Sequence, residues 1–356
     1  MSTFKYYSSK EHIMSESMDA THDQQTTARI LTGLAIMKVK FDASDNTRTK
    51  SLFGNGRMQV KVQVLVSGVD ANGNAMHVPA DVMESIELIH YSTGKTLRDG
   101  WVASTDQGRF TIEARPSTTA GDAPDNDPEN DSVHPQVRTF WVSSSSAGTT
   151  QIGARLSLNG ERILSNGTTL SSVHDSSVTI EAQPPSAYSI EEFRWYQTRR
   201  GDELPGNRIW NHRLGLYPRG QQIKLVDWVV DGVGEGVDHK FAGGNRLNEI
   251  KTNYMEVILV RPEKQRVTVI LPANGDPFVY TFFPDAHTWG REHYDVKVQS
   301  DGELTVVQAL SEYSEAGKSS KYGDKLHFLA IDEHGTEHRL AIRVNFYERN
   351  LYLERG

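Results

Sequence analysis

The clearest pattern in the sequence is a strict alternation of apolar and polar side chains at residues 58–66. Methionine or valine occupies every even position from Met58 to Val66, and glutamine or lysine occupies the odd positions 59–63. Successive side chains of a β-strand point to opposite faces, so this period of two predicts a strand with one buried face. Further short, β-rich runs lie at 85–91, 109–114, 139–142, 150–156, 177–182, 222–230, 255–260, 266–271, 278–283, 303–307, 326–331 and 338–344.

Turn dipeptides separate many of these runs. Both Asn-Gly and Asp-Gly tolerate the positive φ angles of tight hairpin turns, which favours antiparallel pairing of neighbouring strands. Helical candidates are confined to two short segments, 80–84 and 189–197, and neither sustains a period of 3.6 residues. The sequence therefore predicts an all-β fold of antiparallel sheets. The dipeptides lie at 55–56, 72–73, 159–160, 166–167 and 274–275 (Asn-Gly) and at 99–100, 231–232 and 301–302 (Asp-Gly).

The segment Pro184–Ser186 is the best candidate for a domain boundary. It follows a predicted strand, and proline cannot extend a central strand. The length of 356 residues fits two or three domains, and we expect two antiparallel β-sandwich domains, at 29–185 and 186–356. Residues 1–28 are polar and rich in Ser, Thr and Gln, which predicts an arm that is flexible or that a partner orders.

Composition narrows the classes of function. The chain has 38 Lys and Arg against 46 Asp and Glu, a net charge of −8, which argues against general nucleic-acid binding. The absence of cysteine excludes disulfides, thiolate nucleophiles and Cys-ligated zinc. No apolar run is long enough to span a bilayer, and the first thirty residues lack a signal-peptide core. We expect synthesis in the cytoplasm, with leaderless export or incorporation into a particle for any role outside the cell.

The first predicted domain contains two motifs beyond simple alternation. One is the valine strand 60–66 followed by the turn Val69–Gly73, and the other is the run Ser145–Leu156, which precedes the Asn-Gly pair at 159–160. Over residues 55–183 the chain thereby resembles bacterial immunoglobulin-like domains of the invasin and intimin type. The resemblance implies an immunoglobulin-like sandwich with a spacer or adhesive role and no catalysis. Residues 186–356 carry no such resemblance.

Residues 193–219 interleave aromatic and basic side chains. Such mixtures stack on sugars or bases, pair with acidic partners and are enriched at protein–protein hot spots. We rank a protein partner or self-assembly above a carbohydrate, and a carbohydrate above nucleic acid; a long irregular connection anchored on the core is the alternative. The predicted binding residues are Trp195, Arg199, Arg200, Arg208, Trp210, His212 and Tyr217.

An acidic loop at 116–135 offers one candidate metal site. Asp125, Asp127, Glu129 and Asp131 alternate along the chain, a spacing by which a loop can wrap Ca²⁺ with oxygen ligands. The loop lacks the central glycine and the final glutamate of an EF-hand, so a solvated acidic loop is the alternative. No other cofactor is expected.

Three histidines, His327, His334 and His338, surround the last predicted hairpin turn. Turns at the tips of hairpins lie at the surface. We therefore expect all three imidazoles to be exposed.

Taken together, these features favour a non-enzymatic structural or adhesive protein that mediates assembly or attachment. Modular β-sandwiches present binding loops on rigid supports, as phage-tail-like or virion-like particles, bacterial surface fibres and secreted toxin accessories do.

Two alternatives assign a different function to the protein. A carbohydrate-binding module would use the segment 193–219 and the indoles of Trp195, Trp210, Trp228 and Trp289 as platforms. A β-sandwich hydrolase would need paired carboxylates, and the candidates are Asp227, Asp238, Glu292 and Asp295.

Overall fold

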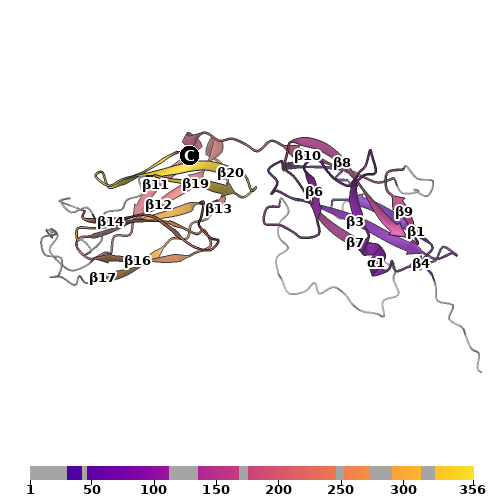
Figure 1. Cartoon of the computed structure of the whole chain (residues 1–356), viewed down its shortest axis with the longest axis horizontal. Helices are drawn as coiled ribbons and strands as arrows, with labels where there is room; N and C mark the ends of the chain where they lie inside the picture. Colours follow the sequence, from indigo (N-terminus) through magenta and orange to yellow (C-terminus); the bar gives the residue numbers. More distant parts are fainter. Residues whose placement is uncertain are drawn as a thin grey trace, which may run out of the picture.

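The computed structural model contains two β-rich halves that lie end to end along the long axis of the molecule (Figure 1). It describes residues 30–41, 46–111, 135–167, 175–245, 252–272, 291–313 and 325–356. The arm predicted at 1–28, the acidic loop up to residue 134, the strand predicted at 278–283 and Trp289 lie outside these ranges. Among the described residues, helix is limited to one short α-helix and two single 3₁₀ turns, which confirms the all-β prediction.

The N-terminal half is a sandwich of two sheets. One sheet has the order β1 (Gly33–Lys40), β3 (Val60–Val69), β7 (Gln136–Ser144), β6 (Trp101–Ser104), with β4 (Ala75–Met76) paired to β3. The other has the order β2 (Thr49–Phe53), β10 (Val178–Gln183), β8 (Gly148–Leu158), β5 (Glu87–His90), with β9 (Glu161–Leu164) paired to β8. These orders correspond to the ABED and CFG sheets of an immunoglobulin constant-type sandwich, with β2 added at one edge.

The core of this half follows the predicted alternation. The side chains of Val60, Val62, Val64 and Val66 on β3 are at most 1% exposed, and they belong to one hydrophobic cluster with residues of the facing sheet. The helix α1 (Ala80–Glu84), predicted at 80–84, packs Val82 into the same cluster.

One strand pair departs from the predicted antiparallel pattern. Strand β2 runs parallel to β10, with Thr49 opposite Thr179. Hairpin turns join only strands that are neighbours in sequence, and β2 and β10 are far apart in the chain. Their relative direction is therefore set by tertiary packing, which turn dipeptides do not encode.

The C-terminal half has three layers. The central sheet has the order β11 (Phe193–Arg199), β12 (Asn207–Leu216), β18 (Leu304–Ser311), β15 (Tyr254–Val260), β14 (His239–Asn245). A sheet of β13 (Leu225–Val229), β19 (Lys325–Asp332), β20 (Glu337–Asn345) and β21 (Asn350–Arg355) packs on one face, and the hairpin of β16 (Arg266–Pro272) and β17 (Arg291–Lys297) packs on the other. The sandwich predicted for this half thus carries a third layer.

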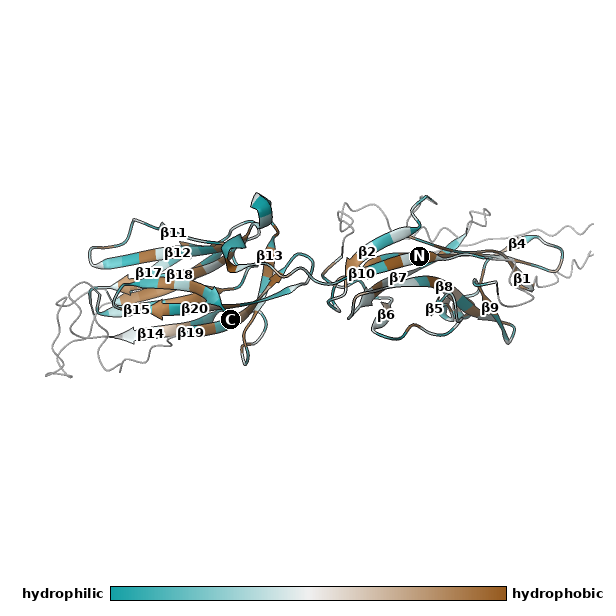
Figure 2. Ribbon diagram, turned by 90° about the horizontal axis from the view of Figure 1, so that it is seen from above, coloured by the Kyte–Doolittle hydropathy of each residue, from teal (hydrophilic) through white to brown (hydrophobic). Residues whose placement is uncertain are grey.

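The central strands explain this extra layer. Every residue of β15 and β18 is buried, so both faces of these strands are covered. Their sequences accordingly read as nearly continuous apolar runs, as expected for strands buried on both sides. Along the strands at the surface, brown hydrophobic and teal hydrophilic residues alternate instead (Figure 2).

The prediction of a short helix at 189–197 is wrong. A capping box between Ser189 and Glu192 closes a single 3₁₀ turn, η1 (Ile190–Glu192), and β11 begins directly at Phe193. Strand β11 pairs with β12 to form a hairpin, so the alternative of an irregular connection over 193–219 is also wrong. Phe193 and Trp195 lie two residues apart and both pack on the core, which is the period of a strand.

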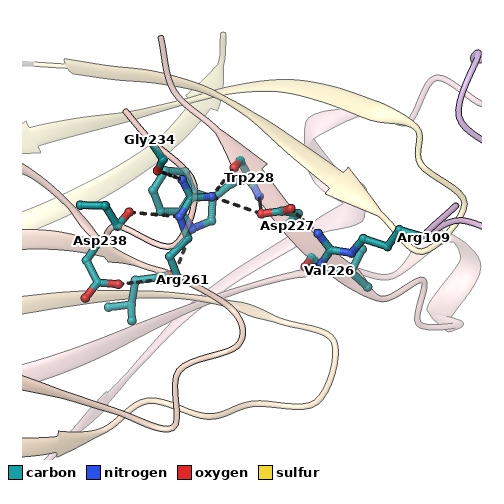
Figure 3. Close-up of polar contacts among 9 residues, drawn as sticks. Arg109, Val226, Asp227, Trp228, Gly234, Asp238 and Arg261 are labelled. Atoms are coloured by element: carbon teal, nitrogen blue, oxygen red, sulfur yellow. Dashed lines mark hydrogen bonds and ion pairs between the residues drawn. The ribbon is translucent and has the colours of Figure 1, made fainter. Parts of the chain in front are cut away.

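A charged contact joins the two halves at their junction. Arg109 of the N-terminal half pairs with the carboxylate of Asp227, and its Nη2 donates to the carbonyl of Val226 at 2.6 Å (Figure 3). Among the described residues, every strand pairing joins strands on the same side of Pro184. Side-chain contacts rather than a shared sheet therefore connect the halves.

A second group of contacts lies at the turn between β19 and β20. Arg57 pairs with Glu337, and Asn55 Nδ2 donates to the carbonyl of His334 at 2.8 Å. The ring of Phe53 lies 5.5 Å from the ring of His334. Two separate sets of contacts thus hold the halves in one orientation.

Candidate functional site

The hairpin β11–β12 distributes the seven predicted binding residues over the two faces of the central sheet. Its register runs from Phe193 opposite Leu216 to Arg199 opposite Trp210, and residues opposite each other lie on the same face. Arg200 and Tyr217 lie on the face toward β16–β17. The face toward the β13–β19–β20–β21 sheet carries Trp195, Arg199, Arg208, Trp210 and His212.

Trp195 and His212 line a groove between the edges of two facing sheets. Strand β11 ends the central sheet and β21 ends the sheet opposite, and the groove between them has a volume of about 460 Å³. The indole Nε1 of Trp195 donates to the carbonyl of Leu351 on β21 at 3.1 Å, which fixes one edge against the other. The lining also includes Tyr196, Gln197, Asn350 and Tyr352.

Within the part of the chain that the structure describes, no strand pairs with the outer edge of β11 along this groove. Arg200 N donates to Ile209 O, which makes the even-numbered residues of β11 the hydrogen-bonded partners of β12. The odd-numbered residues between them, including Trp195 and Gln197, therefore direct their N–H and C=O groups away from β12. Strand β11 thus presents a row of backbone donors and acceptors at the edge of the sheet.

His212 is buried under Trp195 and links the groove to the interior. Its ring stacks on that of Trp195 with centroids 5.2 Å apart, and its Nε2 lies 3.0 Å from Gln308 Oε1. Because an amide oxygen only accepts, Nε2 carries the proton. Burial lowers the pKa of His212, and the hydrogen bond with Gln308 raises it to a smaller extent, so the imidazole is neutral at pH 7.

Arg200 and Tyr217 take part in other contacts on the opposite face. The Arg200 guanidinium lies 5.2 Å from the ring centroid of Tyr294 on β17. The hydroxyls of Tyr217 and Tyr196 each donate to the Glu303 carboxylate at 2.8 Å. Burial, followed by the hydrogen bond with Glu303, raises the pKa of Tyr217 to about 12, so its hydroxyl stays protonated as a donor.

Sequence reasoning missed the part of the groove that β21 supplies. Asn350 and Tyr352 line the groove, but no strand was predicted at 350–355. A signal was present, because Leu351 and Leu353 alternate with polar or aromatic residues in this stretch. The stretch is short and close to the end of the sequence, and its partner β20 is required to make it a strand.

Trp228, one of the expected sugar platforms, does not reach the surface. Its side chain is 0% exposed, and its Nε1 donates to the carbonyl of Val260 at 2.9 Å. The guanidinium of Arg261 lies 3.7 Å from the centroid of its ring (Figure 3). The prediction for this residue is wrong, because β13 directs its indole into the core.

Three of the four carboxylates of the hydrolase alternative, those of Asp227, Asp238 and Asp295, pair with cations. Arg261 Nη1 is 3.3 Å from Asp227 Oδ1, and Lys264 Nζ is 2.7 Å from Asp238 Oδ2. The backbone N of Arg261 also donates to Asp238 Oδ1 at 2.9 Å (Figure 3). Asp295 pairs with Arg266 at 2.7 Å. In these contacts each carboxylate stabilises the structure as an ion-pair partner.

The Ca²⁺ candidates Asp125, Asp127, Glu129 and Asp131 lie outside the described residues, so that site stays a prediction. Within the described ranges, no group of three or more His, Asp or Glu lies close enough to hold a metal ion. The same ranges contain no helix that is long and apolar enough to cross a membrane.

Comparisons with known proteins do not assign a function to the chain. No protein-family model matches the chain, and a comparison with curated proteins finds no match. The solved structures similar to it include one titled "BspA_C_WT", at 9% sequence identity and a TM-score of 0.16, over 90% of this chain and 96% of that chain. A TM-score this low carries no argument about fold or function. The invasin and intimin resemblance therefore stays a prediction beyond the immunoglobulin-like strand order.

Proposed function

We propose that the protein is a non-enzymatic structural or adhesive component that binds an extended segment of a protein partner in the groove between β11 and β21. The observation that carries this proposal is the open edge of β11, where the backbone groups of Trp195 and Gln197 face away from β12. An added strand would pair with these groups, and its side chains would contact the aromatic lining of the groove. Backbone pairing would supply affinity, and the side-chain contacts would supply specificity.

The arrangement of the two halves supports the same role. The contacts of Arg57 and Arg109 across the junction join two sandwiches end to end, so the N-terminal half serves as a stiff support for the groove. A support of this kind suits assembly or attachment in a phage-tail-like, surface or toxin-accessory particle.

A second candidate function is carbohydrate binding at the same groove. Trp195 offers an aromatic face, and Gln197 and Asn350 offer amide groups beside it. Aromatic surface with a few polar groups is the usual composition of a small-ligand site. The two candidates differ in one respect: only a polypeptide strand uses the backbone edge of β11.

The test uses a library of random peptides selected on the full-length protein. Gln197→Pro removes the outward N–H of β11 and is tolerated at an edge strand, whereas Gln197→Ala keeps the N–H and serves as the control. We expect selected peptides to bind the native protein and Gln197→Ala, and to lose binding to Gln197→Pro. Hydrogen exchange should slow at Trp195 and Gln197 when the peptide is bound.

Two results would contradict the proposal. A selection that yields no binding peptide, or peptides that bind Gln197→Pro as well as the native protein, would remove strand addition at β11. Retention on a glycan array that Trp195→Ala abolishes and Gln197→Pro leaves intact would establish the carbohydrate function in its place.

A further inference from the structure

In the described part of the C-terminal half, the two facing sheets end at four strands, and two of these edges meet at the groove. Strands β11 and β14 end the central sheet, and β13 and β21 end the facing sheet. The pairing of β14 is interrupted between Lys240 and Ala242, and that of β13 between Leu225 and Asp227. Such irregularities protect an edge against a further strand. Strands β11 and β21 pair without interruption, and they form the two sides of the groove.

The backbone of β21 is oriented like that of β11. Gly356 N donates to Arg339 O at 3.2 Å, which makes the even-numbered residues of β21 the hydrogen-bonded partners of β20. The odd-numbered residues Leu351 and Leu353 therefore direct their N–H and C=O groups away from β20, toward the groove. The indole of Trp195 reaches Leu351 O from that side. At Trp195, Leu351 and Leu353 the outward backbone belongs to a residue whose side chain packs on the core.

Two side chains already occupy part of the β21 edge. The carbonyl of Leu351 accepts the indole N–H of Trp195 at 3.1 Å, and the N–H of Leu351 donates to Oδ1 of Asn350 at 2.9 Å. An indole and an amide thus take the positions that the N–H and C=O of a neighbouring strand would take. Farther along the groove, the N–H and C=O of Leu353 have no hydrogen-bond partner among the described residues. Backbone groups of this kind bind water or an added strand.

The spacing and the directions of the two edges suit a single strand between them. Facing sheets lie about 10 Å apart and paired strands about 4.8 Å apart, so a strand midway would lie one strand spacing from each edge. Trp195 lies beside Leu351, and Arg355 Nη2 donates to the carbonyl of Tyr188, which precedes β11. Strands β11 and β21 therefore run in opposite directions. A strand between them would be antiparallel to one edge and parallel to the other.

This geometry fixes which face of an inserted strand meets the core. In an antiparallel pair a residue bonds the residue opposite, whereas in a parallel pair it bonds the two neighbours of the residue opposite. Since both edges present the backbone of inward-facing residues, alternate residues of the inserted strand would bond the two edges in turn. Those that bond the antiparallel edge would point inward, and those that bond the parallel edge would point outward. The inward side chains would contact Ile190, Phe193 and Leu353, which line the groove and pack on the core.

We propose that the bound segment lies between β11 and β21, pairs with both edges and carries an apolar residue at every second position. The inference rests on the proposed function, because the strand added to β11 is the same segment. Its inward residues join the core beside Phe193, and its outward residues face water, which favours polar side chains there. Insertion also breaks the bond between Trp195 Nε1 and Leu351 O, because the new strand donates to that carbonyl.

The experiment measures binding of synthetic peptides to the full-length protein by isothermal titration calorimetry. In the probe, valine alternates with threonine over seven residues, the length of β11, with a lysine and a glutamate at each end for solubility. The control peptide has the same composition with its valines adjacent to one another. Two further versions of the probe carry an N-methyl group, which removes one backbone N–H, on the central valine or on the threonine beside it.

We expect the alternating probe to bind and the control peptide to bind at least about tenfold more weakly, as exposure of a buried valine would cause. Each N-methyl version should raise the Kd at least about threefold, because the valine bonds one edge and the threonine bonds the other. The indole N–H signal of Trp195, assigned in the NMR spectrum by its absence from Trp195→Phe, should shift on binding. Equal binding of probe and control, or weaker binding of only one N-methyl version, would overturn the inference.

A pair of protein variants tests the β21 edge directly. Leu353→Pro removes the outward N–H of β21, and Leu353→Ala shortens the side chain but keeps the N–H as the matched control. We expect Leu353→Pro to raise the Kd of the probe at least about threefold relative to Leu353→Ala. The N-methyl peptides ask the same question of the native protein, so the test does not depend on the folding of a variant.

The two proposals fail in different ways. If peptides lose binding to Gln197→Pro but bind Leu353→Pro as well as Leu353→Ala, the proposed function stands and pairing with both edges is wrong. If the alternating probe does not bind while library peptides without alternation do, only the apolar pattern and the insertion are wrong. If binding is lost in Leu353→Pro but not in Gln197→Pro, strand addition at β11 is wrong. Dimerisation of the protein alone, abolished by Gln197→Pro in light scattering, would make a second copy of the chain the occupant.

Discussion

At the scale of single residues, Arg261 organises the interior next to the junction. Its side chain is 6% exposed, and its nitrogens donate to the carbonyls of Val237, Trp228 and Gly234 at 3.0, 2.9 and 2.7 Å. The same guanidinium lies over the indole of Trp228 and pairs with Asp227 (Figure 3). Asp227 also binds Arg109 of the N-terminal half. Arg261 therefore helps to position the carboxylate that forms part of the junction.

We expect Arg261→Ala to destabilise the C-terminal half by about 3–5 kcal/mol, because it leaves three carbonyls without this donor and removes one of the two cations that pair with the partly buried Asp227. Urea unfolding followed by tryptophan fluorescence measures the effect. Arg266→Ala, which removes an exposed pair with Asp295, should cost less than about 1 kcal/mol. Equal costs for the two variants would contradict the role assigned to Arg261.

The buried His212 makes stability depend on pH. Burial lowers its pKa in the folded protein below the ordinary 6.5, so the unfolded chain binds a proton that the folded chain does not. Stability contributed by the neutral imidazole is therefore present above pH 6.5 and is lost as pH falls toward the folded-state pKa, by up to about 1.4 kcal/mol per pH unit.

The prediction is a melting temperature that falls from pH 7.5 to pH 5.5, and a smaller fall in His212→Gln. His239, whose pKa burial also lowers, contributes in the same direction, so His239→Gln alone should remove only part of the dependence. Differential scanning calorimetry at the two pH values gives the comparison. An identical fall in the native protein and His212→Gln would show that His212 does not cause it.

At the scale of elements, two hairpin turns in different halves share one arrangement. Asp70 Oδ1 accepts the backbone N–H groups of Asn72 and Asn74, and Asp332 Oδ1 accepts those of His334 and Thr336, each at 2.9 Å. A glycine with a φ near +80° follows three residues after each aspartate. Both turns thus use an aspartate and a positive-φ glycine at the same spacing.

The turn that begins at Asp332 also contacts a buried histidine. Asp332 is 2% exposed, and its Oδ2 lies 3.0 Å from Nε2 of His338, which is 6% exposed. The expectation that all three histidines near this turn are exposed is therefore wrong for His338. The alternation of β20 directs this imidazole inward, where it lies near the rings of Tyr188 and Phe193.

We expect Asp332→Ala to cost about 2–4 kcal/mol, because it leaves two backbone N–H groups and a buried imidazole without an acceptor. Chemical denaturation provides the measurement. Asp301→Ala is the control: Asp301 also precedes a glycine in a turn, but its carboxylate is 84% exposed and pairs with the side chain of Lys224, so a cost below about 1 kcal/mol is expected. A small cost for Asp332→Ala would mean that glycine alone sets the turn.

At the scale of the whole molecule, the turn between β19 and β20 also serves as part of the junction. A Cβ on Gly335 would lie 2.9 Å from Arg57 Cβ and 3.0 Å from Phe110 Cγ. The absence of a side chain at this glycine lets the N-terminal half approach the turn closely. The junction thus depends on close packing as well as on the pairs made by Arg57 and Arg109.

The double variant Arg57→Glu, Arg109→Glu should free the two halves from one another. Each new carboxylate faces an existing one, Glu337 or Asp227, and like charges repel. We expect small-angle scattering to report a broader range of particle lengths, and thermolysin to cut at 184–189 several-fold faster. Arg155→Glu, which breaks a pair with Glu87 inside the N-terminal half, should do neither. Unchanged scattering of the double variant would contradict a charge-held junction.

The same proteolysis tests the domain boundary predicted at Pro184–Ser186. If the boundary is right, the two products of the cut, which contain the domains 29–185 and 186–356, remain folded, because each half has its own hydrophobic clusters. Loss of sheet structure by either fragment would move the boundary or remove it.

The sequence by itself determined many of the strands and the all-β class. The alternation from Met58 to Val66 encodes one buried face wherever the strand packs, and the Asn-Gly pairs at 72–73 and 159–160 lie in turns between paired neighbouring strands. It also led to the prediction of Trp195 and His212 as binding residues; both line the groove, and their role in binding stays a prediction. Both kinds of inference use only neighbours in the chain.

Only the tertiary structure decided which of these residues share a surface. Trp228 has the same chemistry as Trp195, yet one is buried in the core and the other lines a groove, because the faces of β13 and β11 are set by the sheets they join. Arg199 and Arg200 are adjacent in sequence and lie on opposite faces. Strand β21 meets β11 only across sheets that form between distant segments, and no local pattern encodes such pairing.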